Sequence, residues 1–236
     1  MKTISSEINI EELNASYANL SPLERLAKFY KEFGDKNILV SSSFGTTSAY
    51  LLDLISKTNR KQEIHLINTG YLFKETLDYA EDLSLKLGLN IKTIKPDFHH
   101  HQYTAQNRTW EKDPNLCCSV NKVLPFEEIK KGKDFWISGL IGKQSHSRKD
   151  KDIFERNGDI IKFHPIIDIE LEDVKTYLSK NNLPTNPLFH KGYESVGCFH
   201  CTAKGKGRSG RWKSSTKTEC GLHLPSEKNM KAFAVS

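Results

Sequence analysis

The fold of this chain is decided by residues 37–58, which read NILVSSSFGTTSAYLLDLISKT. Residues 37–41 form the short apolar run of a buried strand, and residues 41–45 are the small residues of a loop. From residue 46 to residue 57, apolar side chains return at helical spacing. The stretch therefore predicts a strand, a loop and a helix, in that order.

The same alternation continues on both sides of this stretch. Upstream, Ser21-Pro22-Leu23-Glu24 is a capping box with proline at the first helical position, which predicts a helix that runs to about Gly34. Downstream, we expect strands at 63–67, 91–95 and 135–138 and helices at 73–87 and 117–130. This spacing is typical of a parallel sheet with helices on both faces, so the predicted fold class is α/β.

The loops that follow the expected strands indicate where a functional site would lie. In parallel sheets, ligands bind outside the carboxyl ends of the strands. Loops 41–45, 68–70 and 139–148 would all emerge there. We therefore expect the active site at this edge of the sheet.

The regular pattern ends after a predicted hairpin and one more helix. Asn157-Gly158 predicts the turn between strands at 152–155 and 160–164, and a helix capped by Asp168 should follow. From Lys191 the sequence is rich in Gly, Lys and Ser without periodicity. We expect an α/β domain at 1–190, with N-terminal helices within 1–34, and a mobile C-terminal segment at 191–236.

The composition is that of a globular protein. The chain has 236 residues, of which 37% are apolar and 27% charged, so a disordered chain is not expected. No apolar run approaches the length of a membrane span, and residues 1–10 lack the apolar region of a secretory signal. We therefore expect a cytoplasmic protein without membrane association.

Positive charge is concentrated near the C-terminus. The formal net charge is +6, and the only acid within residues 191–217 is Glu194. The basic residues of this stretch are Lys191, Lys204, Lys206, Arg208, Arg211, Lys213 and Lys217. This distribution predicts that an anionic ligand binds to the segment.

The five cysteines predict a metal or cluster site and one further thiol. An odd number, in a chain without an export signal, argues against a disulfide framework. Cys117-Cys118 and Cys198-x-x-Cys201 supply four thiolates, which satisfy either zinc or an iron–sulfur cluster. Two adjacent cysteines are poorly spaced to supply two ligands of one tetrahedral zinc ion, whereas an iron–sulfur cluster accommodates them more readily. Two packed thiols and an unrelated redox pair remain open alternatives.

Two further groups indicate anion binding and thiol chemistry. Ser41, Ser42 and Ser43 precede the expected helix, whose N-terminus can hold phosphate or sulfate. The serines could instead serve only as helix caps. Cys220 lies near the basic residues, which would favour its thiolate form. The alternative is that Cys220 is a surface thiol without a function.

Four motifs, taken in order, resemble the assimilatory sulfonucleotide reductases, which are the adenylyl-sulfate and phosphoadenylyl-sulfate reductases. They are Cys117-Cys118-Ser119-Val120-Asn121-Lys122-Val123, Val196-Gly197-Cys198-Phe199-His200-Cys201-Thr202, Gly207-Arg208-Ser209-Gly210-Arg211-Trp212 and Lys217-Thr218-Glu219-Cys220-Gly221-Leu222-His223. The resemblance runs from Ser41 through His223 and so covers most of the chain.

The resemblance implies a fold, a cofactor and a substrate. The fold would be a Rossmann-like sheet of the adenine-nucleotide alpha-hydrolase type. A 4Fe-4S cluster would be held by Cys117, Cys118, Cys198 and Cys201, as in the cluster-containing branch of the family. That branch mostly uses adenylyl sulfate (APS), and the 3'-phosphorylated substrate (PAPS) is the alternative.

The resemblance also implies a mechanism. The Cys220 thiolate would attack the sulfate sulfur and AMP would leave, after which thioredoxin or glutaredoxin would release sulfite from the S-sulfonate, in assimilatory sulfate reduction and cysteine biosynthesis. His223 would orient or protonate groups near the thiol. The residues expected to bind the substrate are Ser41, Ser42, Ser43, Thr69, Gly70, Lys122, Arg148, Arg208 and Arg211.

The chain departs from the family pattern at two places. Ile141-Gly142-Lys143 stands where the family commonly has an arginine-rich stretch with an acid, and Asn121 replaces a common arginine. A different class of function stays open: the basic segment and the C-x-x-C would suit a zinc-containing nucleic-acid-binding or tRNA-modifying protein, although a pure binding module would have no use for Cys220. We expect no nucleic-acid partner, and the sequence leaves a homo-oligomer open.

Overall fold

The computed structural model describes residues 8–212, 217 and 219–223. The parts of the expected N-terminal helices and of the expected C-terminal segment that fall on residues 1–7, 213–216, 218 and 224–236 lie outside the described residues.

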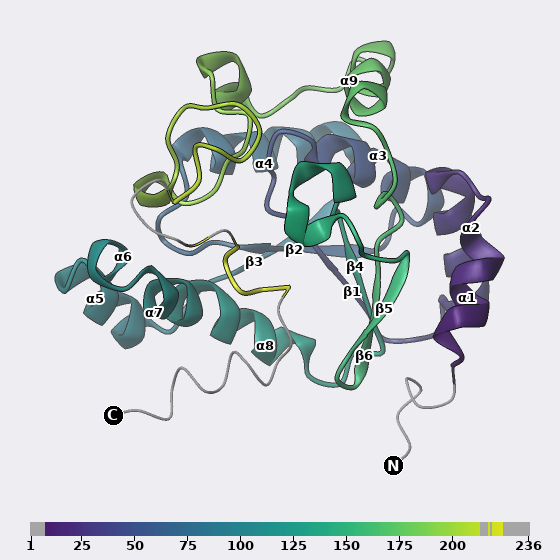
Figure 1. Ribbon diagram of the computed structural model, residues 1–236, viewed down its shortest axis with the longest axis horizontal. Helices are drawn as coiled ribbons and strands as arrows, with labels where there is room; N and C mark the ends of the chain where they lie inside the picture. Colours follow the sequence, from purple (N-terminus) through teal and green to yellow (C-terminus); the bar gives the residue numbers. More distant parts are fainter. Residues whose placement is uncertain (1–7, 213–216, 218, 224–236) are drawn as a thin grey trace.

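A six-stranded sheet forms the centre of the fold (Figure 1). Its strands are β1 (Ile38–Ser41), β2 (Glu63–Ile67), β3 (Asn90–Ile94), β4 (Phe135–Ser138), β5 (Phe154–Asn157) and β6 (Ile160–Phe163), in the order β3-β2-β1-β4-β6-β5. All neighbouring strands are parallel except β5, which pairs antiparallel with β6. The α/β class, the parallel sheet and the hairpin expected from the sequence are confirmed.

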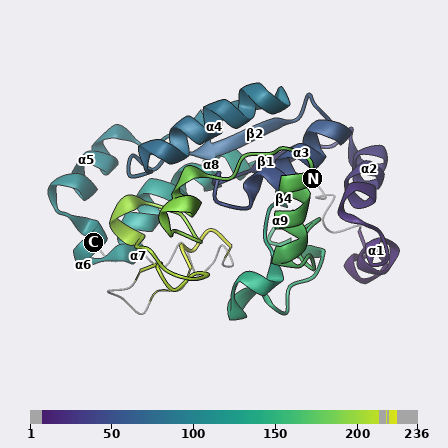
Figure 2. The same ribbon diagram turned by 90° about the horizontal axis from the view of Figure 1, so that it is seen from above.

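Helices cover both faces of the sheet. In Figure 1, α3, α4 and α9 lie above the sheet and α5 to α8 lie below it, and Figure 2 shows again that α1 and α2 are at the opposite end of the molecule from α5 and α6. The helices are α1 (Ile10–Tyr17), α2 (Pro22–Phe33), α3 (Ser48–Thr58), α4 (Lys74–Leu87), α5 (Phe98–Gln106), α6 (Thr109–Lys112), α7 (Pro114–Cys118), η2 (Ser119–Val123), α8 (Leu124–Lys130), η3 (Gly142–Gln144), η4 (His146–Arg148), α9 (Leu171–Lys180), η5 (Pro187–Lys191) and η6 (Phe199–Cys201).

The core is richest in aromatic side chains on the β5 side of the sheet. Phe29 of α2 stacks on Phe163, and Phe163 stacks on Phe154, with ring centroids 4.5 Å apart in both pairs. All three side chains are fully buried. Helix α2 can present Phe29 there because its capping box forms: the Ser21 Oγ accepts from the Glu24 backbone, and Glu24 accepts from the Ser21 backbone.

Asp168 does not cap the helix that follows it, so that expectation was wrong. Helix α9 begins after Glu170, which makes no side-chain cap bond. Asp168 instead accepts two hydrogen bonds, of 2.6 and 2.7 Å, from the guanidinium of Arg25. Because Arg25 is only 2% exposed, its charge needs this partner, and the carboxylate is used for the ion pair.

The helical stretch expected at 117–130 is interrupted. Helix α7 is followed by η2, a π-helical turn, before α8 begins. Helix α5 was not expected at all, because its nine residues have little amphipathic pattern. None of the helices in the described part of the chain is both long and apolar enough to cross a membrane.

Candidate active site

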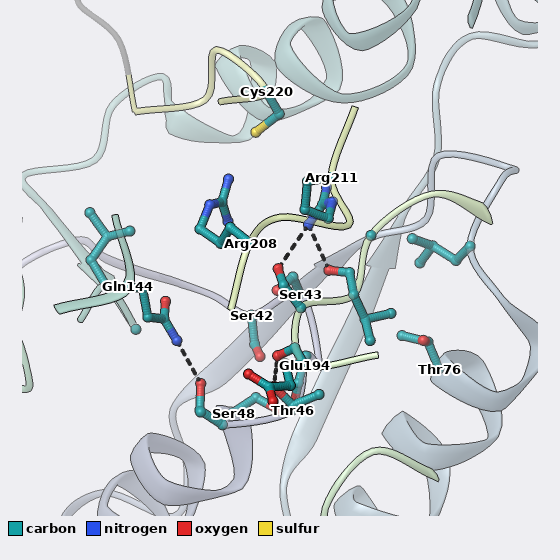
Figure 3. Close-up of a pocket in the computed structure, with 18 of the residues that line it drawn as sticks. Ser42, Ser43, Thr46, Ser48, Thr76, Gln144, Glu194, Arg208, Arg211 and Cys220 are labelled. Atoms are coloured by element: carbon teal, nitrogen blue, oxygen red, sulfur yellow. Dashed lines mark hydrogen bonds between the residues drawn. The ribbon is translucent and has the colours of Figure 1, made fainter. Parts of the chain in front are cut away.

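A cavity of about 770 Å³ opens at the carboxyl ends of the parallel strands. Its walls come from the loops after β1, β2 and β4, from the two cysteine segments and from residues 219–223, which we call the tail (Figure 3). The residues expected from the sequence that line this cavity are Ser41, Ser42, Ser43, Thr69, Cys117, Cys118, Lys122, Arg148, Cys198, Cys201, Arg208, Arg211, Cys220 and His223. Gly70 is the expected residue that does not line it.

The serine loop after β1 forms one wall. The Ser41 hydroxyl accepts a hydrogen bond from the Trp136 indole N–H at 2.8 Å, and Ser42 accepts one from the Phe44 backbone at 3.2 Å. Ser43 is exposed. The N-cap of α3 is Thr47 and makes no side-chain cap bond, so capping of α3 does not explain the serines. Hydroxyls and a helix N-terminus are therefore available to an anion at this wall.

The loop after β2 contacts the cysteine site. The Thr69 hydroxyl lies 3.2 Å from the Cys198 Sγ. Gly70 has a left-handed φ of 78°, and a Cβ there would lie 2.4 Å from the His101 ring. Gly70 therefore allows the turn to pass close to His101, whereas it was expected to bind the substrate.

Four cysteines from two segments face the cavity. Cys117 and Cys118 end α7, whereas Cys198 is the N-cap residue of η6 and Cys201 is its last residue. Burial, together with the nearby thiols of Cys198 and Cys201, raises the pKa of Cys117 to about 12. Burial also raises the pKa of Cys118 to about 12. Among the described residues, no group of three or more His, Cys, Asp or Glu side chains is close enough together to hold a metal ion.

Lys122 and Asn121 lie in the π-helical turn directly after the cysteine pair. Such turns widen a helix locally and are frequent at functional sites. Lys122 reaches the cavity and favours the ionised form of Cys220. Asn121 is 1% exposed, and its amide oxygen accepts a hydrogen bond from the His101 ring at 2.8 Å. Its amide nitrogen donates to the Thr104 hydroxyl and to the Cys117 carbonyl, both at 3.0 Å. Asn121 therefore belongs to a buried polar network beside the cysteine pair.

The tail is held at its first residue by two arginines. Arg148 donates to both carboxylate oxygens of Glu219, at 2.9 and 3.0 Å, and Arg208 donates to one of them at 3.0 Å. Burial alone would raise the pKa of Glu219, but Arg148 and Arg208 hold it below its usual value. The carboxylate is therefore ionised at neutral pH, and both arginines are engaged by the chain itself.

The tail is held again at its last residue. The His223 ring stacks on Trp136 with centroids 4.8 Å apart, and its backbone carbonyl accepts from the buried Lys162 at 3.2 Å. Burial lowers the pKa of Lys162 to about 8 and lowers that of His223 well below its usual value. Among the described residues, no hydrogen bond joins His223 to the Cys220 thiol.

Cys220 lies between these two attachments and is half-buried. Figure 3 shows Arg208 and Arg211 between the thiol and the serine loop. Burial would raise the pKa of Cys220, but the charge of Lys122 and a hydrogen bond from the Leu222 backbone outweigh it, so the pKa is lowered. A thiolate at this position can act as a nucleophile toward a ligand in the cavity.

Arg211 completes the set of cations. Its guanidinium donates to the Val196 carbonyl at 3.0 Å and lies over the Trp212 ring, whereas its Nε is buried without a partner. Among the residues that the structure describes, neither Arg211 nor Lys122 forms a salt bridge with a carboxylate. Their charge therefore remains available to an anionic ligand.

The residues that hold the tail were not predicted from the sequence. Glu219 was expected only as a member of the motif at 217–223, and its position between a basic segment and Cys220 is the one signal that could have singled it out. Trp136 and Lys162 lie in strands β4 and β6, where nothing in the sequence separates a residue that contacts the tail from any other strand residue.

Comparisons with solved structures agree with this architecture. The chain is similar to a phosphoadenylyl-sulfate reductase from Candida auris, with a TM-score of 0.72 and 26% identity over 82% of this chain and 96% of that one. It shares its fold with an NH3-dependent NAD synthetase from Campylobacter jejuni, at a TM-score of 0.50 and 17% identity over 75% of each chain. The fold and the position of the cavity define an α/β protein of the adenine-nucleotide alpha-hydrolase type.

Sequence comparisons narrow this class to one family. The chain belongs to the phosphoadenosine phosphosulfate reductase domain family, whose profile matches residues 37–204. It is 41% identical over 210 residues to a protein of Lysinibacillus sphaericus named adenosine 5'-phosphosulfate reductase, covering 85% of this chain and 90% of the relative. It is 37% identical over 203 residues to adenosine 5'-phosphosulfate reductase 1 of Bacillus subtilis, covering 82% and 87%.

Proposed function

We propose that this protein is an adenylyl-sulfate reductase, which reduces adenylyl sulfate to sulfite and AMP. The observation that carries the proposal is the position of Cys220. Its thiol has a lowered pKa and faces the cavity at the carboxyl ends of the parallel strands, beside Lys122 and Arg211. Relatives that are 37–41% identical over most of the chain are named adenosine 5'-phosphosulfate reductase, which supports this substrate.

The proposed reaction has a covalent first step. The Cys220 thiolate attacks the sulfate sulfur, a bond forms between the two sulfur atoms, and the bond from sulfur to the phosphate oxygen breaks. AMP leaves with that electron pair. Attacker and sulfate are both negative, so Lys122 and Arg211 neutralise the anion, and the serine loop binds the phosphate. His223, whose neutral form is favoured, orients the end of the tail.

A dithiol completes the reaction. We propose that thioredoxin, or a related protein such as glutaredoxin, attacks the Cys220 sulfur, releases sulfite and forms a mixed disulfide, which its second thiol resolves. The dithiol loses two electrons and sulfate gains them. We place this reaction in the cytoplasm, in sulfate assimilation that leads to cysteine. We propose that the chain is organised as a nucleotide-binding α/β domain at 1–190 and a C-terminal segment at 191–236.

We also propose that the four cysteines hold a 4Fe-4S cluster. The chemistry of the donor set fits, because four described thiols from two segments line one cavity, although no three of them lie close enough together to hold a single metal ion as they stand. Burial raises the pKa of Cys117 and Cys118, and a bound metal would favour their ionised forms. Thr69 and Asn121 offer hydrogen bonds to the sulfur atoms of Cys198 and Cys117, at 3.2 and 3.7 Å. When bound, the cluster would supply a charged iron–sulfur group beside Lys122 and join the two segments.

The substrate preference is tested by turnover of the two sulfonucleotides side by side. In anaerobically purified protein with thioredoxin, we expect kcat/KM for adenylyl sulfate to exceed that for the 3'-phosphorylated form by at least about tenfold, because the cysteine set is that of the branch that mostly uses adenylyl sulfate. An equal or higher value for the 3'-phosphorylated form would contradict the preference but leave the reaction class in place. No turnover of either nucleotide would contradict the proposed function.

Replacing Gly197 by alanine tests the role of Arg211. A Cβ at Gly197 would lie 2.2 Å from an Arg211 guanidinium nitrogen, so the side chain must move out of its place. We expect adenylyl sulfate to bind about tenfold more weakly, as measured by equilibrium binding to a Cys220→Ser, Gly197→Ala double variant and to Cys220→Ser alone. The thermal unfolding midpoint serves as the control. Unchanged affinity would show that Arg211 does not contact the ligand.

A further inference from the structure

Glu219 is the one carboxylate of the tail, and it lies next to the residue proposed as the nucleophile. Its side chain is 16% exposed, and those of Arg148 and Arg208 are 11% and 17% exposed. The Ser145 and Ser147 hydroxyls each lie 3.4 Å from the Glu219 Oε1, the oxygen that also accepts from the Arg148 Nε. A carboxylate with this many donors in a sheltered place is held in a defined position.

The arginines are themselves fixed in place. Arg148 belongs to the η4 turn and also donates to the Gln144 side chain at 2.9 Å. Gln144 in turn donates to the Thr47 hydroxyl at 3.4 Å, at the start of α3. A chain of contacts therefore connects the serine-loop end of α3 with the tail residue that precedes Cys220.

We propose that Glu219 is a positioning residue: Arg148 and Arg208 clamp its carboxylate and so hold the Cys220 thiol toward the cavity, while Lys122 and Arg211 are left to meet the ligand's anion. This assignment rests on the proposed function for its substrate, and it gives Arg148 and Arg208 a role different from the substrate contact expected from the family resemblance. The stack of His223 on Trp136 fixes the other end of the tail, so Cys220 is held from both sides.

Three measurements on Glu219→Gln, made on the full chain with its metal content intact, test the assignment. The first is the alkylation rate of Cys220 by iodoacetamide, read by peptide mass mapping, which we expect to rise about tenfold because the half-buried thiol is released. The second is the dissociation constant of AMP, which should not weaken. The third is the single-turnover rate of sulfonation by adenylyl sulfate, which should fall by about 30-fold or more because the thiol is no longer oriented.

Two matched variants separate positioning from general damage. Glu219→Asp keeps the charge and should restore much of the protection from alkylation. Glu128→Gln breaks an exposed Glu–Lys pair on α8, with both side chains more than two-thirds exposed, and should leave all three measurements unchanged.

Unchanged alkylation of Cys220 in Glu219→Gln would overturn the assignment, and so would AMP binding that weakens tenfold together with the rate. Alkylation and AMP binding do not require sulfur chemistry. If the wild-type protein fails to sulfonate Cys220 at all, the proposed function fails, while these two measurements still decide whether Glu219 positions the tail.

Discussion

Replacing Cys220 by serine is expected to reduce turnover of adenylyl sulfate by a factor of about 10³ or more. A serine hydroxyl is not ionised at neutral pH and is a far weaker nucleophile than a thiolate, and a sulfated serine could not be released by thiol exchange. The substrate should still bind, because Lys122 and Arg211 remain in the cavity. The measurement is steady-state sulfite formation with thioredoxin, together with equilibrium binding of AMP.

The control for this variant is its colour and iron content. Cys220 is not one of the four proposed cluster ligands, so both should equal those of the wild-type protein. Substantial activity in Cys220→Ser would show that another group attacks the sulfur. Loss of colour together with loss of activity would instead indicate that Cys220 is a ligand of the cluster.

Replacing Cys198 by alanine is expected to bleach the protein and to abolish activity. A four-iron cluster that loses one thiolate is exposed to solvent and to oxidative loss, and the two segments that it joins would separate. Absorbance near 400 nm should disappear, and iron should fall from about four per chain to near zero.

The nearby variant Thr69→Val is the matched control for Cys198→Ala. It removes the hydroxyl that lies 3.2 Å from the Cys198 Sγ but keeps all four thiols, so most of the colour should remain. Stoichiometric zinc without iron in anaerobically prepared wild-type protein would remove the cluster assignment and favour the zinc alternative.

The sequence predicted the sheet because local patterns suffice for it. The expected strand at 63–67 and that at 135–138 coincide with β2 and β4, since a buried parallel strand is a short apolar run between polar loops. Helix α5 was missed because it lies at the surface with few apolar residues, and Asp168 was taken as a cap because its partner Arg25 is distant in sequence.

The site was predicted as a set of residues but not as a set of contacts. The motifs predicted that the four proposed cluster ligands, Cys220 and the basic residues belong to one site, and the structure brings them to one cavity. The motifs do not indicate that Arg148 binds the carboxylate of Glu219, which lies 71 residues away in the sequence. Nor do they indicate that Trp136 stacks on His223. Such pairings depend on tertiary packing, which no local pattern encodes.

The covalent step at Cys220 is tested most directly by trapping its product. Wild-type protein incubated with adenylyl sulfate but without a reductant should gain about 80 Da on the peptide that contains Cys220, and reduced thioredoxin should remove this mass with release of sulfite. A sulfonate on a different cysteine, or sulfite formed with thioredoxin without any adduct on Cys220, would contradict the account.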